Sequence, residues 1–315
     1  MSTHEPLLIG QTEIAPGQET MVRLPVGRLP TDTRIHMNVW VRRSETPGPH
    51  VLFTAGIHGD EANGVEILRR AISTGLFAEL QRGAVVVVPV VNIIGFIEQE
   101  REAPGGKDVN RSFPGSLSGS LAARMARILT ARILPSCHFG VDFHTGGHSH
   151  YNYPQVRYTA EHAPSLELAQ AFAAPVLLAQ KPIPRSLRKV ALAAGKPVIV
   201  YEGGENLRFD EAAIQCGLDG IRRLLHAYDM LPSAPEPPPV MHARHASWLR
   251  AKRAGLFRRH CRAGDEVRKG QLMGALSDPY GMDEIEVFAP HDCRIIGHTN
   301  QPVVSHGDAL FHLAW

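Results

Sequence analysis

Short apolar runs alternate with segments of helical period through most of the first 230 residues, and this alternation constrains the fold more than any other feature. Val51–Ala55 has the pattern of a strand, and Glu61–Ser73 follows it with apolar residues near helical spacing. Ala84–Val90 is apolar throughout and rich in valine, as expected of a central strand buried on both faces. Strands that alternate with helices form a sheet covered by helices, so we predict an α/β fold.

The alternation extends along the chain. We expect further strands at Phe139–Phe143 and Pro197–Tyr201, helices at Leu121–Leu134, Ser165–Phe172, Arg185–Ala194 and Asp210–Tyr228, and edge strands within Met21–Arg42. A long loop with glycine and proline, Asn92–Ser118, interrupts the pattern. Loops of this length in compact domains are usually functional or disordered.

The character of the chain changes after residue 230. The run from Leu231 to Pro239 contains five prolines and predicts a stiff linker. Beyond it, glycines separate short β-type runs without any long helical period, which is typical of a compact all-β module. We therefore predict a large domain at 1–230, a linker at 231–240 and a β-rich cap at 241–315.

Composition excludes several classes of partner. The formal charge is only +2 and no dense Lys/Arg tract occurs, so we expect no nucleic-acid partner. No window approaches the roughly 20 apolar residues that span a bilayer, so we expect no membrane segment. Met1–Gly10 lacks the pattern of a signal peptide, and the four cysteines are scattered. We therefore expect a cytoplasmic protein with reduced thiols.

Two histidines and a glutamate follow strand-like runs. His58 and Glu61 lie three residues apart after the first run, and His144 ends the run at 139–143. Strand ends of an open α/β sheet share one rim, so these side chains can converge, and with an open fourth position they make a catalytic zinc site. For an isolated HxxE pair the structural alternative is favoured, namely a turn histidine, a helix N-terminal carboxylate and a hydrogen-bonded strand-end histidine.

Further motifs favour the metal interpretation. They are Gly56-Ile57-His58-Gly59-Asp60-Glu61, Asn92 with Arg101, Asp108-Val109-Asn110-Arg111-Ser112-Phe113-Pro114-Gly115, Asp142-Phe143-His144-Thr145 and Tyr201-Glu202-Gly203-Gly204. Through them the chain resembles the succinylglutamate desuccinylase/aspartoacylase family, within the zinc carboxypeptidase superfamily. The resemblance implies a zinc-carboxypeptidase-like mixed sheet flanked by helices, a barrel-sandwich-like C-terminal domain, and one Zn²⁺ per chain bound by His58, Glu61 and His144.

The resemblance also implies roles for other residues. Glu202 would be the general base, with a capping or salt-bridging glutamate as the structural alternative. Arg101 would polarise the scissile carbonyl, unless it pairs with its acidic sequence neighbours. Arg111 would bind the substrate carboxylate with Asn110 adding hydrogen bonds, whereas the alternative for any loop arginine is a solvated surface charge.

Some positions depart from the family pattern. Close relatives commonly carry an arginine near His150, and here Arg157 or Arg188 would have to supply that cation. Three further residues are candidates for the pocket: His148 and His150, in a His-rich loop of the kind that usually faces solvent, and Tyr280, in a turn where packing of its ring is the structural alternative. Asp142 lies two positions before His144, so it either orients that imidazole or has a structural role.

The sequence therefore predicts a zinc-dependent hydrolase of linear amide bonds that deacylates an N-acyl amino acid or a related small carboxylate. The alternatives are a carboxypeptidase or deacylase acting on a peptide-like substrate and a catalytically silent binding protein of the same fold. A lipoyl-type carrier is disfavoured because Lys269 lies in an ordinary polar turn. We interpret the C-terminal module as a cap or an oligomer surface. The second interpretation would make the protein a homo-oligomer.

Overall fold

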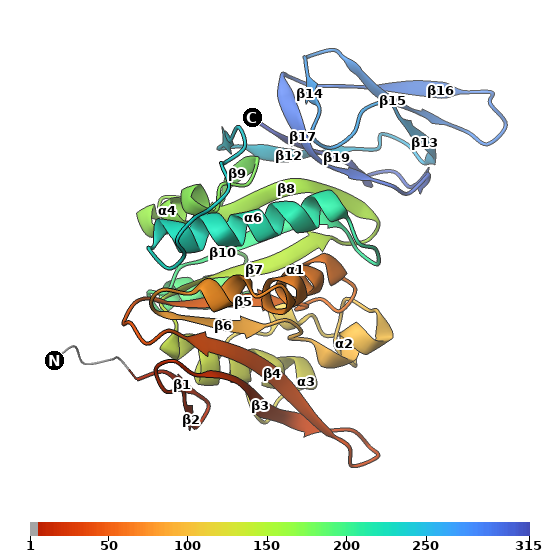
Figure 1. The fold of residues 1–315 in the computed structure, drawn as a ribbon. Helices are drawn as coiled ribbons and strands as arrows, with labels where there is room; N and C mark the ends of the chain where they lie inside the picture. The colour runs from red at the N-terminus through yellow and green to blue at the C-terminus, as the bar shows by residue number, and fades with distance from the viewer. Residues whose placement is uncertain (1–5) are drawn as a thin grey trace.

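A computed structural model describes residues 6–315. Its main feature is a large mixed sheet (Figure 1). Its main path runs through β12 (Ala246–Arg250), β19 (Ala309–Ala314), β17 (Cys293–Thr299), β8 (His150–Thr159), β10 (Val198–Glu205), β7 (Phe139–Gly146), β5 (His50–Ala55), β6 (Ala84–Val88), β4 (Arg34–Arg43) and β3 (Glu19–Arg28). The central strands β6, β5, β7 and β10 are parallel, and antiparallel strands flank them on both sides. The predicted α/β fold is confirmed.

Helices cover both faces of this sheet. They are α1 (Ala62–Ser73), α2 (Ile93–Glu98), α3 (Leu121–Ile128), α4 (Ala163–Phe172), α5 (Leu187–Ala193) and α6 (Glu211–Ala227). Helices α1, α4 and α6 pack on one face, and α3 and α5 pack on the other. Successive side chains of a strand point to opposite faces, so Val51 and Phe53 join the first apolar layer and Leu52 joins the second.

The predicted loop 92–118 contains more structure than expected. It includes α2 and the short helical turn η2 (Val109–Arg111). The side chain of Asn92 accepts a hydrogen bond from the backbone N–H of Gly95 at 3.1 Å and so caps α2. The helix expected at 121–134 is regular only to Ile128 and then continues as a π-helical turn.

Strand β8 is the main element that sequence patterns do not reveal. It lies antiparallel to β10 and parallel to β9 (Val176–Gln180). It begins at His150, in the segment expected to face solvent, and its polar and aromatic residues do not alternate with apolar ones. The expectation of a solvent-facing segment is correct for His148, which is exposed, and wrong for His150, which is partly buried.

Residues 241–315 form strands without any helix, in agreement with the β-rich character predicted for them. The strands of this C-terminal region that have not yet been introduced are β11 (Met241–Ala243), β13 (Gly255–Arg259), β14 (Glu266–Val267), β15 (Leu272–Ser277), β16 (Glu284–Phe288) and β18 (Val303–Val304). Strands β16, β15, β13 and β18 form a separate sheet. Strand β17 instead pairs with β8, so the large sheet continues from the first 230 residues into the C-terminal region (Figure 1).

The parallel strands β5, β7 and β10 direct their carboxyl ends to the same edge of the sheet. His144 on β7 lies directly beside Glu202 on β10 in the strand register. This edge therefore gathers the residues that follow or end each strand. Within residues 6–315, no helix has both the length and the apolar character needed to cross a membrane.

Candidate active site

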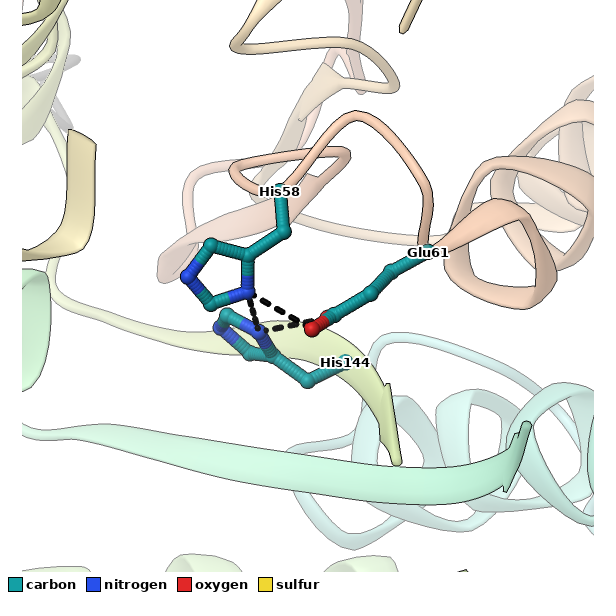
Figure 2. Close-up of side chains that lie close together, drawn as sticks. All are labelled: His58, Glu61 and His144. Carbon is teal, nitrogen blue, oxygen red and sulfur yellow. Dashed lines mark hydrogen bonds and ion pairs between the residues drawn. The ribbon is translucent and has the colours of Figure 1, made fainter. Parts of the chain in front are cut away.

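His58, Glu61 and His144 converge at the carboxyl edge of the sheet (Figure 2). Nδ1 of His58 lies 2.7 Å from Oε1 of Glu61, and Nδ1 of His144 lies 2.9 Å from Oε2. The two Nδ1 atoms are 3.3 Å apart. All three side chains are buried, and one donor atom from each lies within 4.8 Å of the others.

The turn between β5 and α1 brings two of these residues together. Glu61 immediately precedes the first residue of α1, and His58 lies in the loop before it. Gly59 makes the close approach of this loop to α2 feasible, because a Cβ atom there would lie only 1.9 Å from the carbonyl carbon of Gly95. Gly56 has a φ of +58°, a conformation that glycine adopts readily.

Two further carboxylates contact the outer nitrogens of the imidazoles. Asp142 Oδ2 lies 2.8 Å from Nε2 of His144, and the Thr54 hydroxyl donates to the other Asp142 oxygen at 2.7 Å. Asp108 Oδ1 lies 3.3 Å from Nε2 of His58. Carboxylates in these positions orient metal-binding histidines. Asp142 thus has the orienting geometry anticipated from the sequence, whereas Asp108 was recognised only as part of a motif.

The charges within the cluster are mutually stabilising. Burial lowers the pKa of His58 and of His144, but the adjacent carboxylates outweigh burial and raise both pKa values above 6.5. Burial raises the pKa of Glu61, and the two histidines more than reverse this and bring it well below its usual range. Two imidazole nitrogens and one carboxylate are the donors of a catalytic zinc site, so these residues fit a bound metal ion.

Arg101 lies against the same cluster. Its Nη1 is 3.3 Å from Glu61 Oε1, and its Nη2 donates to Asp108 at 3.1 Å. Within residues 6–315, these carboxylates form its ion pairs, and the neighbouring Glu100 and Glu102 do not. The guanidinium is therefore directed into the site.

Asn110 and Arg111 belong to the turn η2. Asn110 Oδ1 accepts a hydrogen bond from the backbone N–H of Leu187 at 3.0 Å, so the amide joins η2 to the start of α5. Arg111 is exposed, and its Nη1 donates to the carbonyl oxygen of Asn110 at 2.8 Å. Both residues line the cavity that contains His58, Glu61 and His144.

Glu202 faces this cavity from β10, and both of its carboxylate oxygens have partners. Arg157 Nη1 lies 3.0 Å from Oε1, and Asn152 Nδ2 donates to Oε2 at 2.8 Å. Glu205, three residues after Glu202, instead accepts a hydrogen bond from Asn300 and does not line the cavity.

One cavity of about 260 Å³ brings together all seven residues predicted for the site. It also includes residues that no sequence motif marked, among them Asn152, Trp248 and Ala309. The last two come from the C-terminal strands, whose contribution depends on the pairing of β17 with β8. Tyr280 does not line the cavity, and 86% of its surface is exposed.

Arg188 forms part of the cavity wall. It is 5% exposed, and its Nη2 donates to the carbonyl oxygen of Lys181 at 3.1 Å. Its Nη1 is buried without a hydrogen-bond partner among the described residues. Burial, assisted by the charge of Arg157, lowers the pKa of Arg188 to about 10. A buried cation with a free donor can bind an anionic or carbonyl group.

The fold and the site together define an α/β protein with a buried cluster of two histidines and one glutamate at the carboxyl edge of a mixed sheet. Residues 47–228 match the family of succinylglutamate desuccinylase/aspartoacylase catalytic domains, and the chain belongs to this family. It is 28% identical over 295 residues to the N-alpha-acetyl-L-2,4-diaminobutyric acid deacetylase of Halomonas elongata, an alignment that covers 87% of this chain and 84% of the relative.

Solved structures agree with this assignment. The succinylglutamate desuccinylase/aspartoacylase of Rhodobacter sphaeroides has a TM-score of 0.82 at 27% identity, covering 94% of this chain and 95% of that one. The product-bound ectoine utilization protein EutE (DoeB) of Ruegeria pomeroyi has a TM-score of 0.86 at 21% identity, covering 99% of both chains. The second similarity shows a common fold.

Proposed function

We propose that this protein is a zinc-dependent amidohydrolase that removes the acyl group from an N-acyl amino acid or a related small carboxylate. The observation that carries the proposal is one cavity in which a buried two-histidine, one-carboxylate cluster accompanies a separate glutamate, Glu202. Family membership and the similarity to a deacetylase support this reaction class.

His58, Glu61 and His144 would hold the zinc ion, because their donor atoms match the ligand types of catalytic zinc sites. The ion supplies Lewis acidity for attack of water on an amide carbonyl. Asp142, at hydrogen-bond distance from His144 Nε2, and Asp108, at ion-pair distance from His58 Nε2, would orient the two rings with their Nδ1 atoms inward.

Glu202 would act as the general base. Its carboxylate takes a proton from water as the water oxygen bonds to the acyl carbon, and gives that proton to the nitrogen as the C–N bond breaks. The products are a free carboxylic acid and an amine. Arg101, which lies beside the cluster, would stabilise the negative charge that develops on the carbonyl oxygen.

Arg111 and Asn110 would bind the carboxylate of the amino-acid portion. Arg111 offers a guanidinium at the exposed side of the cavity, and the amide nitrogen of Asn110 remains a donor because only its oxygen contacts Leu187. The unpartnered Nη1 of Arg188 would bind a second polar group of the substrate. We assign this contact to Arg188 because Nη1 of Arg157 pairs with Glu202.

The decisive variant is Glu202→Gln, which keeps the size of the side chain and removes its basicity. Amine release from a panel of N-acetyl- and N-succinyl-amino acids measures hydrolysis, and elemental analysis measures zinc. We expect turnover to fall by roughly two to four orders of magnitude with unchanged zinc content.

Retained turnover in Glu202→Gln would refute the general-base assignment. If wild-type protein with bound zinc released no amine from any compound in the panel, a peptide-like substrate or a silent binding protein would be favoured. Short acidic peptides in the same assay separate these two outcomes.

A further inference from the structure

The carboxylate of Glu202 is fixed by two side chains from a single strand. Asn152 and Arg157 both belong to β8, and their nitrogen atoms contact different oxygens of Glu202, at 2.8 and 3.0 Å. Asn152 is 5% exposed and Glu202 is 7% exposed, so water competes little for the hydrogen bond between them. The Asn152 contact is a hydrogen bond to a charged acceptor, and the Arg157 contact is an ion pair, and both are stronger than a hydrogen bond between neutral groups.

The sheet register explains how both side chains reach Glu202. Across the antiparallel pair, Gln155 lies opposite Glu202, and Arg157 lies two residues from it on the same face. In a regular strand Asn152, three residues before Gln155, would point to the opposite face, but the register shifts between Glu202 and Gly204 and places Asn152 opposite Gly204. On its other side, Asn152 lies opposite Gly297 of β17. A Cβ atom on Gly297 would lie 3.0 Å from the Asn152 oxygen, so glycine there leaves room for the amide.

A hydrogen bond to one oxygen and an ion pair to the other restrict the rotation of the Glu202 carboxylate. The terminal torsion of a glutamate is otherwise broad, so an unheld carboxylate samples many orientations. Each oxygen has a second lone pair and can still accept the proton of an attacking water. Fixing the reacting group in advance lowers the barrier, and a misplacement of about 1 Å can cost about 100-fold in rate.

We propose that Arg157 and Asn152 are positioning residues that hold Glu202 for proton transfer. This inference rests on the proposed function of Glu202. The competing assignment is a substrate contact, since Arg157 lines the cavity and its Nε is buried without a partner among the described residues.

The test is a double-mutant cycle that combines Arg157→Met with Glu202→Gln. Arg157→Met alone is expected to lower kcat by about 100-fold, to change KM little and to leave the zinc content unchanged. If Arg157 acts through Glu202, the double variant is no slower than Glu202→Gln alone. Added ethylguanidinium should partly restore kcat in Arg157→Ala, and Asn152→Ser should show the same kcat-selective loss.

Arg111→Ala provides the matched control, because a substrate contact should mainly raise KM and its effect should add to that of Glu202→Gln. Additive losses in the Arg157 cycle, or a raised KM with unchanged kcat, would overturn the positioning role. If Arg157→Met does not fold, Arg157→Lys, which retains the charge, is measured in its place and judged by the same changes in kcat and KM. A fully active Glu202→Gln variant would instead reject the proposed function itself.

Discussion

Each imidazole of the proposed metal site lies between two carboxylates. His144 contacts Glu61 through Nδ1 and Asp142 through Nε2. His58 contacts Glu61 through Nδ1, and its Nε2 lies at the longer distance of 3.3 Å from Asp108. An outer carboxylate fixes the ring and makes the inner nitrogen a better donor to a metal. At the scale of single residues, we therefore expect the affinity for a metal ion to depend on side chains that are not proposed ligands.

We expect Asp142→Ala to weaken zinc affinity by about 10- to 100-fold, because the His144 ring loses the group that orients it. Competition with a chromophoric chelator measures the affinity. His58→Ala removes a ligand and should lose bound zinc altogether, which gives the upper limit of the effect. Wild-type affinity in Asp142→Ala would show that the ring is oriented without this carboxylate.

The convergence of His58, Glu61 and His144 could be predicted from the sequence because each follows or ends a strand-like run, and their proposed role as metal ligands comes from the further motifs and the family resemblance. Their convergence follows from the parallel arrangement of β5 and β7. The contacts of Asn152 and Arg157 with Glu202 could not be predicted, because they require β8 to pair with β10. A strand with mixed polar and aromatic residues gives no periodic signal that would place it there.

At the scale of elements, the site depends on how the β5–α1 loop packs against α2. Gly59 lies against the backbone of Gly95 and Phe96. Because these contacts are with backbone atoms, no change of side-chain rotamer can make room for a larger residue at position 59. The loop carries His58, so any displacement of its backbone also moves a proposed ligand.

Gly59→Ala is therefore expected to lower the free energy of unfolding by about 1–3 kcal/mol, in the range of overpacked sites, and to weaken zinc binding. Urea unfolding of the metal-free protein measures the first effect. Gly27→Ala is the control, because its added methyl group would meet no atom closer than 3.5 Å. Equal stabilities of the two variants would contradict the packing argument.

At the scale of the whole molecule, the large sheet joins the proposed catalytic residues to the C-terminal strands. The Pro-rich run after residue 230 predicts two separate domains from the sequence. The structure adds a direct ladder between β17 and β8, with His298 opposite Tyr151. We propose that residues 241–315 form a cap that completes the cavity with Trp248 and Ala309.

Two buried histidines of the C-terminal strands, His298 and His312, should make the free energy of unfolding depend on pH. Burial, assisted by Arg259, lowers the pKa of His298 to about 4, and burial, assisted by Arg157, lowers that of His312 to about 3. An unfolded histidine titrates near 6.5. Between pH 6.5 and the folded pKa, the unfolded chain binds more protons, so the free energy of unfolding falls as the pH falls.

We expect His312→Gln to have a flatter dependence of Tm on pH than the wild type between pH 6.5 and 4, measured on metal-free protein. The exposed His306 gives a control, since His306→Gln should retain the wild-type slope. Identical slopes in all three proteins would exclude His312 as a source of the acid sensitivity.

The ladder from β17 through β8 to β10 also limits how this enzyme scaffold can be recombined. Replacing only the C-terminal region with that of a relative would pair β8 with a β17 strand of different sequence. Strand β8 carries both side chains that contact the Glu202 carboxylate, Asn152 and Arg157. A functional chimera should therefore exchange β8 and β17 as one cassette, with the crossover points outside the two strands.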